Sequence, residues 1–280
     1  MTVLVTGATG NIGRKVVDRL LELGVPDIRA LTNNPAKADL PEGVEVVTGY
    51  LGRPETLSVA LADVDRLYLA PYPPTIGITC EMIAAARVSY LVALSGGAHW
   101  QQHADTIAAA GVPAIQLGPG EFCENFAMWA PQIAATGTVR EPYPDVVEAP
   151  IAMDDIARVA ASLLAAPDDA HLGQMYELTG PRALTRAQIA EQIGIGIGRP
   201  VRFETCSREE ALATLAPVMG DQATWYVDLL AAGVQAPQQA NGLVAELTGA
   251  PAISIDEWAR RNADQFPLPD NGSGGQSSGL

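Results

Sequence analysis

The stretch Thr6-Gly7-Ala8-Thr9-Gly10-Asn11-Ile12-Gly13 decides the fold of this chain. It follows an apolar run, Thr2–Val5, and opens an amphipathic segment, Ile12–Leu23, which is the context of a dinucleotide-binding turn. The first glycine permits the tight turn, the second lets the backbone approach a pyrophosphate, and the third lets the helix pack on the strand. The free amides of the first helical turn then face the anion. An ordinary glycine-rich turn is the alternative.

Further apolar runs follow, and each is nearly continuous in hydrophobicity, as expected for parallel strands that are covered on both faces. Helix-like segments separate them, so we expect an α/β protein with a doubly wound parallel sheet, a Rossmann fold. The expected strands are Thr2–Val5, Ile28–Leu31, Val44–Val47, Arg66–Ala70, Tyr90–Leu94 and Ala114–Leu117, and the expected helices are Ile12–Leu23, Glu55–Leu61, Ile78–Arg87 and Trp100–Ala110.

The second half of the chain changes character and predicts a smaller, mostly helical lobe. Three segments open with capping-box patterns, which are Thr185-x-x-Gln188, Ser207-x-x-Glu210 and Ser254-x-x-Glu257. The expected helices are Thr185–Ile193, Ser207–Leu215, Asp221–Leu230 and Ser254–Asn262. We therefore expect a dinucleotide-binding domain over residues 1–150, a substrate-binding lobe with returning Rossmann elements over 151–266, and a disordered tail over 267–280.

Composition excludes several classes of partner. The 280 residues carry 32 Asp and Glu against 17 Lys and Arg, a net charge of -15, which argues against nucleic acid and anionic membranes. No apolar run reaches the ~20 residues of a membrane helix, and the N-terminus lacks the pattern of a secretory signal. The three cysteines form no CxxC pair, so we expect buried thiols, no metal site and a cytoplasmic protein.

The end of the second expected strand predicts which dinucleotide binds. An acidic residue there would pair with the ribose 2′-hydroxyl of NAD. This chain instead has Thr32-Asn33-Asn34-Pro35-Ala36-Lys37, with no carboxylate before Asp39. Neutral donors with Lys37 and Arg14 would tolerate a 2′-phosphate, so we expect a preference for NADP(H), with NAD(H) possible. The alternative is that Lys37 is a solvated surface residue.

These motifs together resemble the NmrA-like group of atypical short-chain dehydrogenases/reductases, from residue 1 to about Phe266. The resemblance implies a Rossmann domain with a small C-terminal lobe and a substrate cleft at the carboxyl ends of the strands. Besides the glycine turn, it is carried by the segments Asn33-Asn34-Pro35-Ala36-Lys37, Pro119-Gly120-Glu121-Phe122-Cys123-Glu124-Asn125, Asp155-Ile156-Ala157 and Tyr176-Glu177-Leu178-Thr179-Gly180-Pro181.

The turn, the strand ends and this resemblance together predict the residues that hold the cofactor. They are Gly7, Thr9, Gly10, Asn11, Ile12, Gly13, Arg14, Thr32, Asn33, Asn34, Lys37, Tyr50, Leu51, Ala70, Pro71, Leu94, Gly118 and Pro119. The chain departs from the family pattern at three places. The family often has Arg where Asn33 stands, Asp where Tyr50 stands, and Arg where Leu117-Gly118 stands. The second departure changes how the adenine edge is held.

Typical short-chain reductases donate a proton from a Tyr-x-x-x-Lys pair, assisted by a Ser at the end of the fifth strand. The only lysines here are Lys15 and Lys37, and neither lies four residues after a Tyr, so that pair is absent. Ser95 occupies the Ser position, and His99 is the candidate proton relay. The alternatives are that Ser95 caps a helix and that His99 is an exposed surface residue.

Large apolar residues suggest walls for a flat aromatic ligand. They are Tyr72, Phe122, Phe126, Met128, Trp129, Trp225 and Tyr226, and the alternative is that they form plain core. A substrate with a phenol beside its carbonyl would polarise that carbonyl through its own hydrogen bond. Reductases similar to this chain occur in bacterial pathways to angucyclinone-type aromatic polyketides, which makes such a ketone the leading expectation.

The sequence therefore predicts an NADPH-dependent ketoreductase that acts on a small aromatic, polyketide-like ketone without a Tyr-Lys pair. Two alternatives stay open. One is an NAD(P)H quinone reductase, and the other is a non-catalytic, NmrA-like dinucleotide sensor that binds a regulatory protein. The oligomeric state is left open by the sequence.

Overall fold

The computed structural model describes residues 1–96 and 100–267, which divide into two compact units. Unit 1 comprises residues 1–122, 149–182 and 239–253, and unit 2 comprises 123–148, 183–238 and the described residues from 254. The expected single boundary at residue 150 is thus replaced by a discontinuous division. The reason is that the chain leaves unit 1 after Phe122 and returns at Ala149 to add a helix and an edge strand. Residues 268–280 lie outside the described residues.

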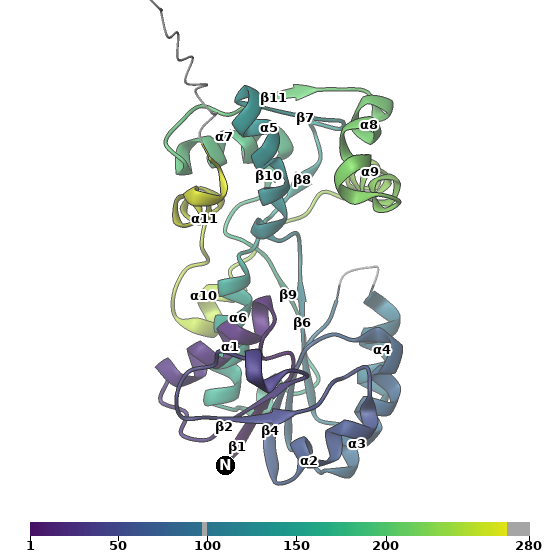
Figure 1. Cartoon of the computed structure of the whole chain (residues 1–280), viewed down its shortest axis with the longest axis vertical. Coiled ribbons are helices and arrows are strands. Elements are labelled where there is room, and N and C mark those ends of the chain that lie inside the picture. Colours follow the sequence, from purple (N-terminus) through teal and green to yellow (C-terminus); the bar gives the residue numbers. More distant parts are fainter. Residues whose placement is uncertain (97–99, 268–280) are drawn as a thin grey trace, which may run out of the picture. The chain divides into compact units, whose positions relative to one another are not determined.

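Unit 1 is built on a seven-stranded parallel sheet with the order β3-β2-β1-β4-β5-β6-β9 (Figure 1). This confirms the predicted doubly wound sheet, since the order reverses between β1 and β4. The strands are β1 (Thr2–Val5), β2 (Ile28–Thr32), β3 (Val44–Thr48), β4 (Val64–Leu69), β5 (Tyr90–Leu94), β6 (Ala114–Pro119) and β9 (Met175–Leu178). The first six match the predicted strands, whereas β9 was not predicted.

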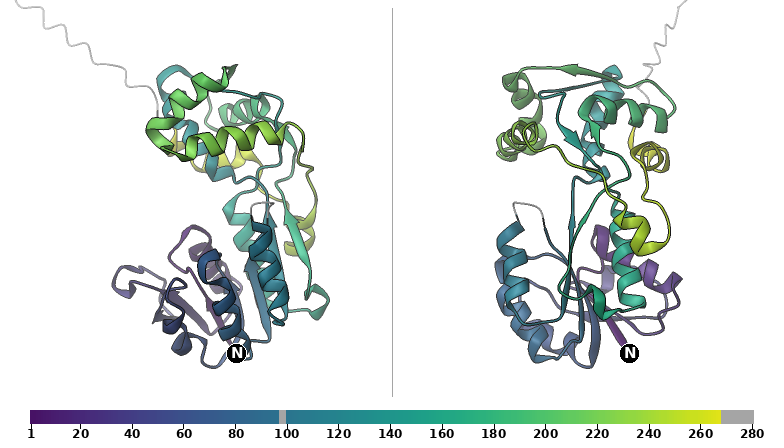
Figure 2. Two further views of the ribbon diagram at one scale, coloured as in Figure 1. Left: turned by 90° about the vertical axis from the view of Figure 1, so that its right-hand side faces the viewer. Right: turned by 180° about the vertical axis from the view of Figure 1, so that it is seen from behind.

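Helices cover both faces of this sheet, which explains why its central strands are apolar on both sides. Alternate residues divide between the faces: Val3 and Val5 pack under α1 (Asn11–Glu22) and α6 (Met153–Ala165). Leu4 packs on the opposite side, under α2 (Leu57–Leu61) and α3 (Ile76–Ala85). That side also carries α4 (Gln101–Ala109), and Figure 2 shows the two helical layers from further directions. The short α10 (Leu243–Thr248) packs against α6.

Short 3-10 turns connect several of these elements at the ends of the strands. In unit 1 they are η1 (Pro35–Lys37), η2 (Pro54–Thr56), η3 (Pro73–Thr75) and η6 (Asp169–His171). A proline opens each of the first three, where its fixed φ suits the first helical position.

Unit 2 is mostly helical, as predicted for the second lobe. Its helices are α5 (Ala130–Thr136), α7 (Arg186–Gly196), α8 (Arg208–Met219), α9 (Gln222–Gly233) and α11 (Ile255–Arg261), with the turns η5 (Cys123–Trp129) and η7 (Ala263–Gln265). Its strands form two pairs: β7 (Thr138–Glu141) with β11 (Arg202–Thr205) in parallel, and β8 (Val147–Glu148) with β10 (Leu184–Thr185) in antiparallel register.

Two of the three predicted capping boxes form. The Thr185 and Ser207 hydroxyls accept from the amides of Gln188 and Glu210, whose side chains reach back to the cap amides. The third was wrong, because Ser254 makes no side-chain cap bond in the described chain although α11 does begin after it. All three cysteines are buried, and burial raises the pKa of the Cys80 thiol to about 11. Within the described ranges no helix is both long and apolar enough for a membrane span.

Candidate functional site

The glycine turn closes between β1 and α1 as the sequence predicts. Gly7 has φ +60°, and a Cβ on it would lie 2.8 Å from the Ala70 Cβ. A Cβ on Gly13 would lie 2.1 Å from the Gly7 carbonyl oxygen. The Thr6 hydroxyl donates to the Tyr68 carbonyl at 3.0 Å and accepts from the Ala70 amide at 2.8 Å. The turn is therefore held against the end of β4, and its close contacts require glycine.

The first turn of α1 is open to an anion. Gly10 is the N-cap, no side chain caps the helix, and its first turn carries no acidic residue. The amides of Asn11 and Ile12 thus keep their hydrogen-bonding capacity at the positive end of the helix dipole. This arrangement fits a pyrophosphate, which needs amide donors and close backbone approach.

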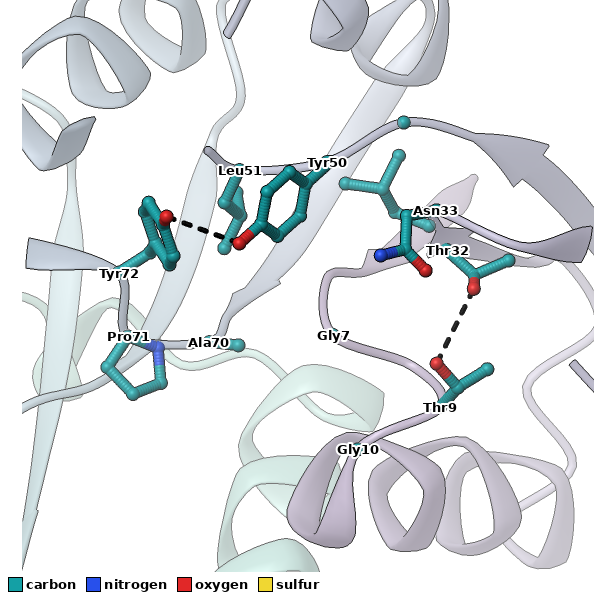
Figure 3. A pocket seen from close by; sticks show the side chains of 12 residues that line it. Gly7, Thr9, Gly10, Thr32, Asn33, Tyr50, Leu51, Ala70, Pro71 and Tyr72 are labelled. Carbon is teal, nitrogen blue, oxygen red and sulfur yellow. Dashed lines mark hydrogen bonds between the residues drawn. The ribbon is translucent and has the colours of Figure 1, made fainter. Parts of the chain in front are cut away.

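A pocket of about 270 Å³ opens beside the turn (Figure 3). It lies at the carboxyl ends of β1, β2, β3 and β4, where ligands bind in doubly wound sheets. It brings together many of the predicted cofactor residues, and it adds Leu31, Gly49 and Tyr72, which the cofactor prediction missed. The residues that line it are Gly7, Thr9, Gly10, Leu31, Thr32, Asn33, Gly49, Tyr50, Leu51, Ala70, Pro71 and Tyr72.

The other predicted cofactor residues lie around this pocket. Ile12 and Gly13 are buried within α1, and Leu94, Gly118 and Pro119 lie at the ends of β5 and β6. Asn11, Asn34 and Lys37 are exposed. Arg14 is engaged elsewhere, because its guanidinium donates to Asp18 at 3.2 Å and to the Asp39 carbonyl. Their contacts with a cofactor remain a prediction.

The end of β2 carries neutral groups. The Thr32 hydroxyl lies 3.4 Å from the Thr9 hydroxyl and accepts from the Asn34 amide at 3.2 Å. Asn33 is exposed at the pocket rim, and no carboxylate is found among the residues that line the pocket. Because a carboxylate would repel a 2′-phosphate, this rim suits a phosphorylated ribose.

Two tyrosines meet at the side of the pocket. Tyr50 follows β3 and Tyr72 follows β4, and the Tyr50 hydroxyl donates to the Tyr72 hydroxyl at 3.2 Å. The rings are T-shaped, with centroids 5.4 Å apart. The neighbouring Tyr50 phenol raises the pKa of the Tyr72 phenol above its ordinary 10.0. Tyr72, predicted as a substrate-binding residue, lines this pocket together with the cofactor residues, and its contact with a substrate stays a prediction.

Ser95 lies at the carboxyl end of β5, as predicted. Its amide donates to the Leu117 carbonyl at 2.7 Å, its side chain is 4% exposed, and its hydroxyl is buried without a partner among the described residues. Gly96 turns the chain with φ +97°, against the Gly118 backbone. The second catalytic candidate, His99, lies outside the described residues. Any proton relay through it is untested.

One turn further along, α4 carries a histidine that was not among the predicted site residues. His103 is 3% exposed, and neither ring nitrogen has a partner in the described structure. Burial lowers the pKa of its imidazole below the ordinary 6.5. The Trp100 ring meets it edge-on at 5.6 Å. No sequence pattern distinguishes a buried histidine from an exposed one in this short helix.

Three of the seven predicted wall residues form core instead. Phe126 and Trp129 are 1% and 0% exposed, and Tyr226 is buried, so these three offer almost no surface to a ligand. Trp225 is half exposed on α9, and Met128 is half-buried beside the core of that unit. Phe122 is half-buried beside the unit 1 core, with a backbone bridge to Ile151.

The physical reason for this burial is Arg186. Its guanidinium lies over the rings of Phe126 and Trp129 at 5.0 and 4.9 Å, and bonds to Glu141 and Glu148. The aromatic rings thus surround a buried ion-pair network within unit 2, and the interpretation of these side chains as ligand walls was wrong.

Comparisons with known proteins show which family the chain resembles. Residues 7–112 match the family described as NAD(P)H-binding. The chain is 32% identical to the (4-alkanoyl-5-oxo-2,5-dihydrofuran-3-yl)methyl phosphate reductase of Streptomyces griseus subsp. griseus, over 94% of this chain and 99% of that protein. It is 30% identical to the NAD(P)H azoreductase of Xenophilus azovorans, again over 94% and 99%.

Solved structures share the architecture. The NADPH complex of the quinone oxidoreductase QOR2 from Escherichia coli superposes with a TM-score of 0.81, at 25% identity, over 93% of this chain and 99% of that one. A mutant of NmrA superposes with a TM-score of 0.74 at 14% identity, over 92% and 94%, which shows the fold alone.

Proposed function

This chain belongs to the NAD(P)H-binding reductases, and from that premise we propose that it reduces a conjugated carbonyl compound with NADPH. The chain is an NAD(P)H-dependent oxidoreductase, and its substrate class is what the proposal adds. The leading substrate is the ketone of an aromatic, polyketide-like compound that carries a phenol beside the carbonyl.

The observation that carries this proposal is that the chain keeps the serine of typical short-chain reductases but lacks their Tyr-Lys proton donor. Ser95 is the hydroxyl at the carboxyl end of β5, and no lysine follows Lys37 anywhere in the chain. A lysine-assisted tyrosine therefore has no counterpart here. When bound, NADPH supplies the hydride, and the chain contributes a fixed turn, a fixed pocket and the Ser95 hydroxyl.

The consequence falls on the substrate. Negative charge that develops on a carbonyl oxygen must be stabilised, and without a strong proton donor the substrate has to share in that task. Conjugation spreads the charge, and an adjacent phenol donates an internal hydrogen bond. Orientation by the protein contributes the rest, because a well-placed acceptor needs less acid catalysis.

The relatives support a conjugated acceptor. One is a reductase of an alkanoyl dihydrofuranone phosphate, another is an azoreductase, and a third, from Escherichia coli, is a quinone oxidoreductase at 26% identity over 77% of this chain. A quinone is therefore the second candidate substrate. Its product would be a hydroquinone, whereas the ketone would give a stereodefined alcohol.

The test is NADPH oxidation with three matched acceptors: an ortho-hydroxyaryl ketone, the same ketone with the phenol methylated, and a para-quinone. We expect the hydroxyaryl ketone to react at least about tenfold faster than its methylated partner, because the internal hydrogen bond is lost. Equal rates for the two ketones would show that the phenol of the substrate does not assist the reduction. Turnover of the quinone alone would select the second candidate, and inactivity with intact NADPH binding would support a sensor.

Ser95→Ala tests the residue. We expect its kcat to fall by at least about tenfold while its stability is unchanged or slightly higher, because the hydroxyl is buried without a partner. Ser58→Ala, on the exposed side of α2, is the matched control and should change neither quantity. A full rate in Ser95→Ala would remove Ser95 from the mechanism.

A further inference from the structure

The polar side chains that line the pocket are largely engaged with one another. Thr9 and Thr32 are paired through their hydroxyls, and Tyr50 and Tyr72 are paired through theirs. Asn33 is the remaining polar side chain, and it lies on the exposed rim. Neither a carboxylate nor a cationic side chain is among the described residues that line the pocket. A bound base would meet phenol rings and aliphatic surface.

The tyrosine pair spans two strands of the sheet. Tyr50 follows β3 and Tyr72 follows β4, and β2 and β1 lie between those strands. The hydroxyl bond therefore joins the ends of two strands that are not neighbours in the sheet, and Figure 3 shows the two tyrosines that it connects. A second hydrogen bond connects the same two segments, since the Thr75 hydroxyl donates to the Leu51 carbonyl at 2.6 Å.

The rings are also fixed by what lies beneath them. A Cβ on Gly52 would come within 2.4 Å of the Tyr50 ring and 2.8 Å of the Tyr72 hydroxyl, so the backbone passes directly under the pair. Tyr50 is nevertheless 36% exposed. The ring is thus held in place while part of its surface stays accessible, which is what a preorganised stacking surface requires.

The order of the pocket walls indicates which part of a dinucleotide lies against Tyr50. The glycine turn and the start of α1 suit the pyrophosphate, and the end of β2 suits the adenosine ribose. Continuing outward along the sheet, the next strand end is that of β3, where Gly49, Tyr50 and Leu51 lie. The base beyond the ribose therefore reaches Tyr50.

We propose that Tyr50 is the surface on which the purine base of the dinucleotide stacks, that Tyr72 braces it, and that the site accepts bases with either an amino or an oxo group at their edge. This inference rests on NAD(P)H binding and is independent of the hydride acceptor. Every purine has a π face, so stacking tolerates changes at the edge. A phenol hydroxyl both donates and accepts, whereas an ionised carboxylate only accepts and would select the amino group of adenine.

The direct experiment compares the calorimetric Kd of NADPH with that of its hypoxanthine analogue, in which an oxo group replaces the amino group. We expect the two constants to agree within about threefold for the wild-type protein. A preference of tenfold or more for NADPH would overturn the inference, because it would show that the edge of the base is read.

Substitutions at Tyr50 separate stacking from edge recognition. Tyr50→Ala should raise the Kd of both dinucleotides by about tenfold, which is the effect expected when one stacked base loses its aromatic partner. Tyr50→Asp should also lose the stack but favour adenine over hypoxanthine by several-fold, since a carboxylate accepts from the amino group and cannot donate to the oxo group. Unchanged binding by Tyr50→Ala, or no selectivity in Tyr50→Asp, would contradict the proposal. Thermal unfolding of each variant separates lost binding from lost folding.

The role of Tyr72 is tested by a double-mutant cycle. Tyr50→Phe and Tyr72→Phe each remove the same hydroxyl bond, so each should weaken NADPH binding by no more than about threefold and the double variant should lose no more than either. Additive losses would show that the hydroxyls act separately and would remove the bracing role. Tyr176→Phe, on β9 at the far edge of the sheet, is the control for loss of a phenol hydroxyl and should bind normally.

Discussion

Arg186 donates two hydrogen bonds to the same carboxylate oxygen of Glu141: its Nε and Nη2 atoms lie 3.1 and 2.7 Å from Glu141 Oε2. Both side chains are 1% exposed. The other oxygen of Glu141 accepts from the Trp129 indole at 2.7 Å and from the Tyr226 hydroxyl at 3.1 Å. Glu148 accepts from Arg186 Nη1 at 2.8 Å. The network joins α7, α9, β7 and β8 of unit 2.

Replacing Arg186 should destabilise unit 2 strongly. Arg186→Met leaves Glu141 buried and uncompensated, which we expect to cost about 3–5 kcal/mol of unfolding free energy. Denaturant unfolding followed by hydrogen exchange at amides of unit 2 measures it. Arg208→Met is the control, because the Arg208–Asp228 pair at 2.7 Å is exposed and should contribute less than about 1 kcal/mol. Equal effects of the two substitutions would contradict the assignment.

Replacing Gly13, the third glycine of the turn, by alanine should displace the turn and weaken cofactor binding. The Cβ of Gly13→Ala would lie 2.1 Å from the Gly7 carbonyl oxygen, so the turn must move. We expect NADPH affinity to fall by at least about tenfold and stability to fall by about 1–3 kcal/mol. Gly77→Ala, which meets open space on α3, should bind normally and be slightly more stable. Normal binding by Gly13→Ala would show that the turn is more adaptable than its contacts indicate.

A carboxylate at the end of β2 should shift the cofactor preference. In Asn33→Asp the new charge lies at the pocket rim, where it repels a 2′-phosphate and accepts from a ribose 2′-hydroxyl. We expect the Kd for NADPH to rise by about tenfold or more while that for NADH stays level or falls. Titration of both dinucleotides with wild-type and variant protein measures this. A preference of the wild-type protein for NADH would contradict the expectation that the neutral end of β2 favours NADPH.

Acidification should destabilise the protein through His103. Burial lowers the pKa of this imidazole below 6.5, so the folded state keeps it neutral while the unfolded chain takes up a proton. The contribution of the neutral imidazole to the free energy of unfolding is therefore fully present above about pH 6.5 and is lost as the pH falls below that value. The free energy of unfolding of His103→Leu should fall less than that of the wild type between pH 7.5 and 5.5 in urea unfolding, because leucine takes up no proton when the chain unfolds.

Two features make that comparison informative. The buried Asp155 has a pKa raised mainly by desolvation, but it is present in both proteins and its effect cancels in the difference. Identical pH dependence of wild type and His103→Leu would mean that the folded protein accommodates the protonated ring.

Much of the fold follows from local pattern. The central strands β1, β4 and β5 are nearly continuous apolar runs, and a sheet covered on both faces requires that pattern. The edge strand β9 escaped prediction because its residues alternate, with Met175 41% exposed and Leu178 buried. The glycine turn was predicted together with its physical roles, since each role depends on backbone geometry within eight residues.

The features that escaped prediction depend on contacts between distant parts of the chain. Phe126 and Trp129 read as an aromatic surface, and only the approach of Arg186, 57 residues after Trp129, makes them core. The hydroxyl bond between Tyr72 and Tyr50, 22 residues earlier, joins the ends of two strands that are not adjacent in the sheet. Nothing in the local sequence near either residue indicates such a partner.

The discontinuity of unit 1 has a consequence for synthesis. When the ribosome has made residues 1–122, the first six strands and α1 exist, but the part of the sheet face that α6 covers is still bare, and α6 ends only at Ala165. At about 5–20 residues per second the apolar residues of that face wait for seconds, during which the chain makes all of residues 123–148 of the other unit. A nascent chain paused in that interval should be a substrate for chaperones, and one released there should aggregate.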